Sequence, residues 1–366
     1  LRLNARRNPR RVAVRFREWA LSYADLLAST ERAMSALAGL GIAPGEKVPM
    51  LSVNHPDMLV AYFALTGIGA VPAPLNYRLS DEDLRHGMSA AHARFVLLGS
   101  AFAERADALA DPAWRWIWFA DAESHAPAGA TRWRALLSGA EGPVPEGRAG
   151  NTVMLHTSGT TGRPKGVMLT HRNIIADLRT VLETLPAVAS GSFKFLSFLP
   201  LSHMFERTVG YYVPLCMRGG AQVIYARGIL ELGEDLVSQR PSILVSVPRI
   251  FERVYAKVEE NLPPGSIKRK LFEKTVDIGW KRFRGEASLL DHLLWPILNV
   301  LVAKKLRARL GGNIRYIFLG GAALAPHLTR VFTGVGLTFI HGYGLTETSP
   351  TLAPTPPEER TPLESR

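Results

Sequence analysis

The sequence predicts an α/β fold with two doubly wound, mainly parallel sheets and flanking helices. Short apolar runs alternate with longer segments of helical periodicity along most of the 366 residues, which is typical of parallel βαβ units. Segments rich in glycine and hydroxyl side chains follow several apolar runs, at the carboxyl ends of strands where such sheets bind ligands. A Pro- and Gly-rich stretch, 126–150, predicts a linker between a first lobe, 1–150, and a second lobe, 151–366.

The elements of the first lobe follow from this alternation. Strands are expected at 12–16, 47–53 and 94–98, and helices at 23–40, 57–66 and 81–91. Ser22 is the expected N-cap of the first of these helices.

The second lobe is expected to open with a strand at 152–156, a loop, and a helix over roughly 171–185. Later strands are expected at 195–198, 222–225, 243–247, 314–319 and 337–340.

Composition indicates a globular protein. The hydrophobic fraction is 47% and the charged fraction 21%, values that argue against disorder. One cysteine excludes an internal disulfide framework and fits a reducing compartment. The longest uncharged apolar stretch, 293–303, is shorter than the ~20 residues that span a bilayer. These features predict a cytoplasmic chain.

Positive charge gathers in one stretch. The net charge is +12, and residues 268–315 hold twelve Lys or Arg against four Asp or Glu. Such a basic stretch with neighbouring aromatic residues suits peripheral contact with the inner face of a membrane, an anionic cofactor, or simply a solvated helix face. Nucleic acid is not predicted as a partner, because no zinc-ligand spacing or RNA-binding signature accompanies the charge.

The strongest motif is the segment 155–166, LHTSGTTGRPKG. Glycines allow backbone N–H groups to approach a polyphosphate, hydroxyls donate to its oxygens, and a lysine offsets its charge. The segment is not a Walker A loop, because its lysine lies between proline and glycine. We expect it to connect a strand to a helix. The predicted ATP-binding residues here are Thr157, Ser158, Gly159, Thr160, Thr161, Gly162 and Lys165.

This loop resembles the phosphate-binding signature of the adenylate-forming superfamily, which includes acyl-CoA synthetases, luciferase and peptide-synthetase adenylation domains. Four further segments resemble family motifs in the same order: FLPLSHMFERT at 198–208, VPRIFE at 247–252, LGGAAL at 319–324 and HGYGLTET at 341–348. Together they cover nearly the whole chain. The resemblance implies the N-terminal part of the adenylate-forming enzyme fold.

The resemblance also implies the chemistry. The substrates are a carboxylic acid, ATP and CoA, and the cofactor is Mg²⁺. The carboxylate displaces pyrophosphate from ATP to form an acyl-adenylate, which the CoA thiol then attacks. The segments 198–208 and 264–310 resemble the long-chain fatty acid subgroup. Two alternatives stay open: a ligase for short, aromatic or carrier-protein-linked acids, and a nucleotide- or acyl-binding module without turnover.

Residue roles on the nucleotide side are implied by the same resemblance. Glu347 and Thr157 are expected to hold Mg²⁺, a hard cation that prefers oxygen ligands. Thr346 is expected to donate to the α-phosphate, and Tyr343 to stack on adenine. The remaining nucleotide-side residues are Gly320, Gly321, Ala322, His341, Gly342 and Gly344.

The predicted acyl pocket comprises His203, Phe205, Gly210 and Arg249. His203 is expected to orient the adenylate carbonyl rather than act as a base, because a fatty acid is already ionised at pH 7. Arg249 pairs with a phosphate or with a nearby glutamate. Gly210 follows His203 by seven residues, near two helical turns along one face.

The family's ribose-binding aspartate, hinge and C-terminal lid with its lysine have no counterpart among residues 348–366. We therefore expect this chain to bind ATP with Mg²⁺ but to turn over poorly by itself. The sequence leaves the oligomeric state open.

Overall fold

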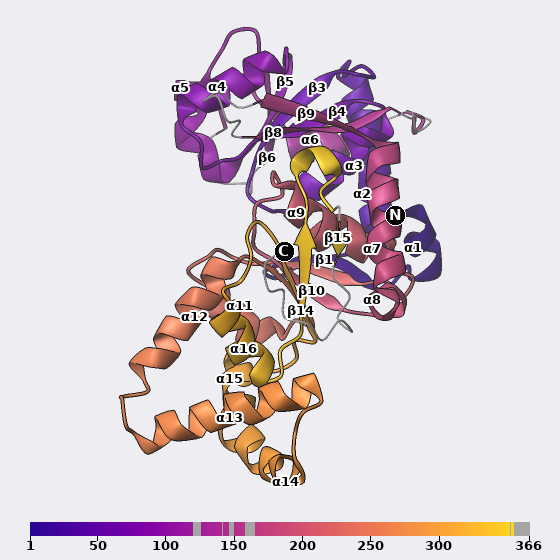
Figure 1. Cartoon of the computed structure of the whole chain (residues 1–366). Helices are drawn as coiled ribbons and strands as arrows, with labels where there is room; N and C mark the ends of the chain where they lie inside the picture. Colours follow the sequence, from indigo (N-terminus) through magenta and orange to yellow (C-terminus); the bar gives the residue numbers. More distant parts are fainter. Residues whose placement is uncertain (120–125, 141, 146–149, 158–164, 352, 355–366) are drawn as a thin grey trace.

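The computed structural model describes residues 1–119, 126–140, 142–145, 150–157, 165–351 and 353–354. Within these ranges the chain forms an eight-stranded sheet, a five-stranded sheet and a separate two-stranded hairpin. Figure 1 shows the five-stranded sheet at one end of the molecule and a group of helices at the other. The predicted α/β class with mainly parallel sheets is confirmed.

The eight-stranded sheet is parallel except at its two edges, where β15 and β2 pair antiparallel. Its strand order is β15 (Ala353–Pro354), β14 (Phe339–Tyr343), β13 (Tyr316–Leu319), β12 (Ile243–Ser246), β10 (Lys194–Ser197), β11 (Gln222–Tyr225), β1 (Val12–Phe16) and β2 (Trp19–Ser22).

The five-stranded sheet is parallel throughout. Its order is β4 (Val71–Pro74), β3 (Lys47–Leu51), β5 (Phe95–Gly99), β6 (Arg115–Phe119) and β7 (Thr131–Arg132). The boundary predicted at residue 150 does not follow the sheets, because β1 and β2 lie before it yet join the eight-stranded sheet beside β11. The division into lobes stays a prediction.

Helices of the first 150 residues cover these sheets. They are α1 (Arg2–Arg7), α2 (Tyr23–Gly39), α3 (Pro56–Gly67), α4 (Asp81–Ala90), the 3₁₀ helix η1 (Ser100–Arg105), α5 (Ala106–Leu109) and α6 (Trp133–Ser138). Ser22 caps α2 as expected: its hydroxyl accepts a hydrogen bond from the Asp25 amide, and the Asp25 carboxylate accepts one from the Ser22 amide. The stretch predicted as a linker contains β7 and α6.

The later helices begin with α7 (His171–Thr184), α8 (Pro186–Ser190) and a helix in three parts, α9 (Met204–Arg207), the π-helical η2 (Thr208–Tyr212) and α10 (Val213–Cys216). They continue with α11 (Leu232–Gln239), α12 (Pro248–Glu260), α13 (Ile267–Arg284), α14 (Leu289–Leu298), the π-helical η3 (Asn299–Ala303), α15 (Lys304–Arg309), α16 (Pro326–Gly334) and the 3₁₀ turn η4 (Thr346–Thr348).

The hairpin departs from the sequence-based expectation. Strand β8 (Asn151–Thr157) pairs antiparallel with β9 (Lys165–Thr170), and α7 follows β9 directly. The expected strand–loop–helix connection is therefore wrong, because a second strand intervenes. The glycine- and threonine-rich segment leads into strand β9, and the N-terminus of α7 comes only after that strand.

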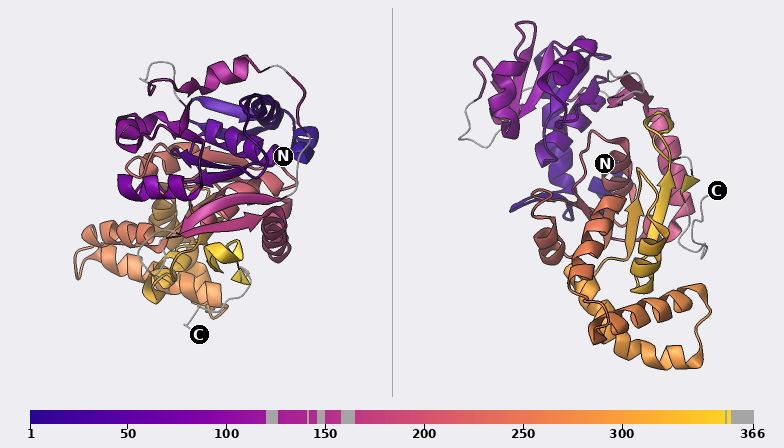
Figure 2. Two further views of the ribbon diagram at one scale, coloured as in Figure 1. Left: turned by 90° about the horizontal axis from the view of Figure 1, so that it is seen from above. Right: turned by 60° about the vertical axis from the view of Figure 1, so that its left-hand side comes forward.

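The core runs through both sheets. One buried cluster spans β1, β3, α2, α3, α7 and the central strands of the large sheet, and a second lies between that sheet and helices α11–α16. Figure 2 shows the helices from α12 to α15 extending away from the sheets. None of the described helices combines the length and apolar composition that a bilayer-crossing segment needs.

Candidate functional site

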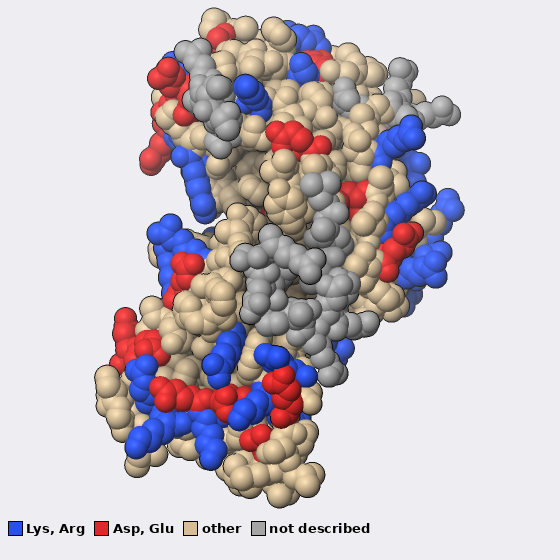
Figure 3. Space-filling view, viewed as in Figure 1, with Lys and Arg blue, Asp and Glu red and all other residues tan. Residues whose placement is uncertain are grey.

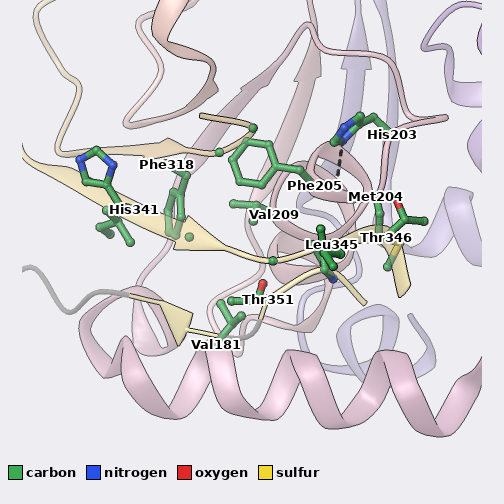
Figure 4. Close-up of a pocket in the computed structure, with 16 residues that line it drawn as sticks. Val181, His203, Met204, Phe205, Val209, Phe318, His341, Leu345, Thr346 and Thr351 are labelled. Atoms are coloured by element: carbon green, nitrogen blue, oxygen red, sulfur yellow. Dashed lines mark hydrogen bonds between the residues drawn. The ribbon is translucent and has the colours of Figure 1, made fainter. Parts of the chain in front are cut away.

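A cavity of about 250 Å³ lies at the carboxyl ends of the central strands. Figure 4 shows its walls, which come from α7, α9, η2, β13, β14 and the turn after β14. The lining residues are Val181, His203, Met204, Phe205, Val209, Phe318, Gly320, Gly321, Ile340, His341, Gly342, Gly344, Leu345, Thr346, Pro350 and Thr351.

Strand order explains why these segments meet. β10, β12, β13 and β14 are parallel neighbours, so their carboxyl ends share one edge of the sheet. The chain leaves β10 into the loop that carries His203, leaves β13 into Gly320, and leaves β14 toward Thr346. Three motifs that are distant in sequence therefore line a single cavity.

Eight of the predicted site residues line this cavity: His203, Phe205, Gly320, Gly321, His341, Gly342, Gly344 and Thr346. Others lie outside its lining. The Tyr343 side chain is 69% exposed, and Ala322, Glu347 and Arg249 are exposed as well. Thr157 and Lys165 lie on the hairpin. Their binding and catalytic roles stay predictions.

The central part of the predicted phosphate loop, 158–164, lies outside the described residues. Its flanks are Thr157 and Lys165, which face each other across the hairpin as the last and first residues of β8 and β9. β9 also contacts η4, the turn that contains Thr346 and Glu347. The hairpin strand that begins at Lys165 therefore lies against the Thr-Glu turn.

His203 has a defined orientation at the cavity. It is the N-cap residue of α9, and its Nδ1 accepts a hydrogen bond from the Phe205 amide at 3.3 Å. An accepting Nδ1 requires the tautomer that carries the proton on Nε2. Although part of the ring is exposed, the surrounding protein displaces enough water to lower the pKa of His203. A neutral His203 therefore offers an Nε2–H donor.

Phe205 forms a wall of the cavity and packs against a glycine. A β-carbon at Gly320 would lie 2.8 Å from two carbons of the Phe205 ring, so a larger residue at 320 would displace the ring. Gly321 adopts φ +82°, a left-handed conformation that favours glycine. The Gly-Gly pair therefore lets the backbone after β13 approach the cavity closely.

The turn after β14 is fixed by its own contacts. Thr348 Oγ1 accepts a hydrogen bond from the Leu345 amide. The same hydroxyl lies 2.9 Å from the carbonyl oxygens of both Leu345 and Pro350 and donates to one of them. A β-carbon at Gly344 would overlap the Pro350 carbonyl oxygen. This compact turn holds Thr346 at the cavity and leaves the Glu347 carboxylate in solvent.

Gly210 does not line the cavity. A β-carbon at this position would overlap the Glu206 carboxylate, and Gly210 lies in the π-helical η2. The wider turn changes which residues share a face, so the seven-residue spacing from His203 does not place Gly210 on the cavity wall. Arg249 forms no ion pair with Glu206 or Glu252 among the described residues.

The helix that lines the cavity also carries a buried carboxyl. Glu206 is fully buried in α9, and this burial raises its pKa to about 8, with the Ser197 hydroxyl offsetting only part of the effect. The neighbouring Arg207 is also buried; its Nε donates to the Leu201 carbonyl at 2.9 Å, and its guanidinium stacks over the Tyr62 ring. These contacts anchor the helix that begins at His203.

Sequence reasoning missed two residues that hold the cavity walls. Asn54 Oδ1 accepts from the Leu201 amide at 3.1 Å, and its Nδ2 donates to the Leu199 carbonyl at 2.8 Å. Both partners belong to the loop that carries His203. Asp177 in α7 accepts from the amide of the cavity residue Thr351 at 3.1 Å, and its burial raises its pKa to about 7.

Comparison with known proteins identifies a matching family and relatives of this chain. The AMP-binding enzyme family matches residues 1–365. A long-chain-fatty-acid–CoA ligase of Mycobacterium bovis, FadD15, is 31% identical over 326 residues, which cover 86% of this chain and 53% of that protein. Long chain acyl-CoA synthetase 3 of Arabidopsis thaliana is 34% identical over 225 residues, 59% of this chain and 33% of the plant protein. The chain thus spans about half the length of the bacterial relative.

Two solved structures share the fold. The N-terminal domain of FACL13 from Mycobacterium tuberculosis has a TM-score of 0.69 at 22% identity and covers 95% of this chain and 75% of that one. A benzoate CoA ligase from Burkholderia xenovorans has a TM-score of 0.71 at 21% identity, with coverages of 97% and 62%. These two structures show the fold, and the family match over residues 1–365 shows that the chain belongs to the AMP-binding enzyme family.

Proposed function

We propose that this protein activates a long-chain fatty acid with ATP, forming an acyl-adenylate and then an acyl-CoA. The observation that carries the proposal is the single cavity at which the loop of His203, the Gly320–Gly321 pair and the Thr346 turn meet. Each of these segments matches a different motif of the adenylate-forming pattern.

The nucleotide side of the proposal uses the glycines and the turn. Gly321 and Gly342 leave backbone next to open space, which suits a flat purine, whereas the Gly320 backbone packs closely against Phe205. Thr346 lines the cavity and is the proposed donor to the α-phosphate. Thr157 and Lys165, at the two ends of the hairpin loop, are the proposed contacts to the outer phosphates.

Glu347 and Thr157 fit the proposed Mg²⁺ position by their chemistry. The Glu347 carboxylate is exposed and forms no ion pair within the described part of the chain, so it remains available to a hard cation that keeps most of its waters. When bound, Mg²⁺ would neutralise phosphate charge. The protein holds Glu347 on the turn that the hydrogen bond from the Leu345 amide to Thr348 Oγ1 closes.

The acyl side of the proposal uses the apolar wall. Phe205, Val209, Phe318 and Leu345 line the cavity and would contact the carbons next to the carboxyl group. A volume of about 250 Å³ is below the ~300–1,000 Å³ of pockets that enclose a whole small molecule. The tail of a long acid therefore requires movement of a wall residue, and Phe205 is the proposed one.

The proposed chemistry proceeds in two balanced steps. A carboxylate oxygen of the fatty acid bonds to the α-phosphorus of ATP as the bond to pyrophosphate breaks. The CoA thiolate then attacks the carbonyl carbon, and AMP leaves. Both steps gather negative charge, so alignment and charge stabilisation supply most of the rate. Nε2–H of His203 is the proposed donor that orients the acyl carbonyl.

Acyl sulfamoyladenosines, stable mimics of the adenylate, test this proposal by calorimetry. The hexadecanoyl compound should bind more tightly than ATP, and much more tightly than the benzoyl compound, because each buried CH₂ contributes about 0.8 kcal/mol. Tighter binding of the benzoyl compound would favour an aromatic acid ligase. Binding of neither compound would contradict adenylation at this site.

Glu347→Gln tests the proposed metal contact separately. ATP affinity should lose most of its dependence on Mg²⁺ concentration while thermal stability stays unchanged, because the side chain is exposed. A normal Mg²⁺ dependence would move the metal contact to another residue.

The proposal also includes peripheral membrane contact through the basic stretch 268–315 at the inner face of a membrane. Long fatty acids partition into bilayers, so contact with a bilayer would bring the enzyme to its substrate.

A further inference from the structure

The helix α14 exposes an apolar face. Six large hydrophobic side chains lie in solvent along α14 and η3: Leu289 is 85% exposed, Leu290 63%, Leu293 73%, Ile297 59%, Val300 57% and Leu301 46%. Figure 1 places α14 at the end of the molecule opposite the five-stranded sheet, and Figure 3 shows uncharged surface at this end next to a band of charge. We call this surface, residues 289–301, the α14 face.

The α14 face is followed along the chain by exposed basic residues. α14, η3 and α15 follow each other without a break over 289–309, and Leu289, Leu293, Ile297 and Val300 recur at helical spacing. Where this row ends, the exposed positions become Lys304, Lys305 and Arg309. No acidic residue occurs between 292 and 309.

The side of the helix opposite the α14 face is already packed against the protein, so the helix cannot rotate to bury the α14 face. Leu298, Ala303 and Leu306 are the buried residues of this segment, and α14 and η3 contact α13. A surface helix normally buries its apolar stripe and exposes polar residues. This one is apolar on both sides, so its outer face requires another apolar environment.

A groove lies at the basic end of the α14 face. It has a volume of about 490 Å³, and it is open to solvent between α12, α13 and α15. Leu262, Leu271 and Leu301 form part of its wall, and Lys268, Lys305 and Arg309 stand in its lining. Within the described ranges these three cations form no ion pair, so they are free to meet anions.

We infer that the α14 face docks on an anionic lipid bilayer, with α14 lying in the plane of the interface. The leucines and Ile297 enter the acyl boundary, while Lys305, Arg309 and Lys268 meet lipid phosphates in the groove. This inference rests on the peripheral contact included in the proposed function and narrows it to one helix and one groove.

Charge favours lipid over a second copy of the chain. The leucines alone would suit either partner, but the cations next to them require anions. A second α14 face brings one carboxylate, Asp291, which already accepts hydrogen bonds from the Ser288 amide and hydroxyl, so it cannot balance the cations at the other end of the helix. An anionic membrane surface supplies hydrocarbon and phosphate side by side, which matches the order of side chains along the helix.

Flotation with lipid vesicles tests the inference on the purified protein. Binding should be strong to phosphatidylcholine vesicles that contain phosphatidylglycerol, weaker to phosphatidylcholine alone, and should fall as salt rises. The variant Leu293→Glu with Ile297→Glu should lose about tenfold or more of the vesicle affinity, because two apolar anchors are removed. Both side chains are exposed, so the fold should be kept.

Matched controls separate the α14 face from general effects. Leu230→Glu changes an apolar residue that is 90% exposed elsewhere and should leave vesicle binding intact. Lys304→Gln with Lys305→Gln should reduce the preference for anionic vesicles, whereas Arg6→Gln with Arg7→Gln, an adjacent exposed pair on α1, should not.

Three outcomes would overturn the inference. These are absence of vesicle binding by the unchanged protein, unchanged binding by the Leu293 and Ile297 variant, and self-association that this variant abolishes, which would assign the face to a second copy. Affinity for the hexadecanoyl sulfamoyladenosine is measured on the same samples. Because the α14 face lies apart from the cavity lining, that affinity should not change, so failure of docking and failure of the proposed function are distinguishable.

Discussion

At the scale of single residues, Gly344 and Gly342 are two positions apart but have different surroundings. A β-carbon at Gly344 would overlap the Pro350 carbonyl, whereas one at Gly342 would meet nothing within 4 Å. Gly344→Ala should therefore lower the free energy of unfolding by about 1–3 kcal/mol, as measured by denaturant unfolding. Gly342→Ala should leave stability nearly unchanged and weaken ATP binding. Equal stability of the two variants would contradict the tight turn.

Glu206 makes a pH-dependent contribution to stability. Its pKa is about 8 in the folded protein against an ordinary value of 4.5, so between these values the folded state keeps a proton that the unfolded state has lost. Stability therefore falls as pH rises from about 4.5 to 8. Asp177, with a pKa of about 7, acts in the same direction.

The substitution Glu206→Gln isolates this contribution. The variant should gain stability relative to the unchanged protein as pH rises from 5 to 8, by on the order of 2–4 kcal/mol, while the two should be similar near pH 5. Unfolding by urea across this pH range provides the measurement. A constant difference between the two proteins would show that Glu206 does not titrate there.

The motifs located much of the site, but not the residues that support it. His203, Gly320, His341 and Thr346 were predicted from local patterns, and they line one cavity. Asn54 and Asp177 carry no local signal, because their partners lie 145 and 174 positions away in the chain. Such contacts depend on the arrangement of strands, which spacing within a motif does not encode.

At the scale of elements, the loop that carries His203 depends on Asn54. This side chain, just beyond β3 of the five-stranded sheet, bonds the backbone of Leu199 and Leu201 beyond β10 of the large sheet. Asn54→Ala would leave both partners without these bonds, which should cost about 1–3 kcal/mol of stability. It should also weaken binding of the acyl sulfamoyladenosine.

Asn261→Ala is the matched control, because Asn261 is exposed and its side chain, among the described contacts, donates only to the Lys257 carbonyl in the helix that it caps. Its effects on stability and ligand affinity should be small. If Asn54→Ala lowers stability without altering affinity, then the link between the sheets does not position the loop of His203.

The sequence predicted parallel strands better than the hairpin. β1 and β11 occur with the predicted bounds, because short apolar runs between helices have few other interpretations. β9 was missed: its residues Lys165–Thr170 follow a glycine-rich loop and end at the helix N-cap Thr170, so the helix signal dominated. Gly166 packs against Met154 across the hairpin, a contact that no periodicity indicates.

At the scale of the whole molecule, two sheets and a hairpin bring distant parts of the chain to one cavity. The alternation of strands and helices predicted the class of the fold, but not that β1 would pair with β11, about 200 positions later. This pairing joins the beginning of the chain to the sheet that carries the site. Pairings over such distances follow from the packing of the whole core.

Formation of hexadecanoyl-AMP is the most direct test of the central claim, that this cavity activates a fatty acid by adenylation. The protein is mixed with hexadecanoate, ATP and Mg²⁺ without CoA, and the adenylate is measured by mass spectrometry at high protein concentration, so that a slow reaction remains visible. The account predicts hexadecanoyl-AMP in excess of benzoyl-AMP from an equal mixture of acids, and a large loss with Thr346→Val. Absence of hexadecanoyl-AMP above the protein-free background, or equal formation by the Thr346→Val variant, would contradict it.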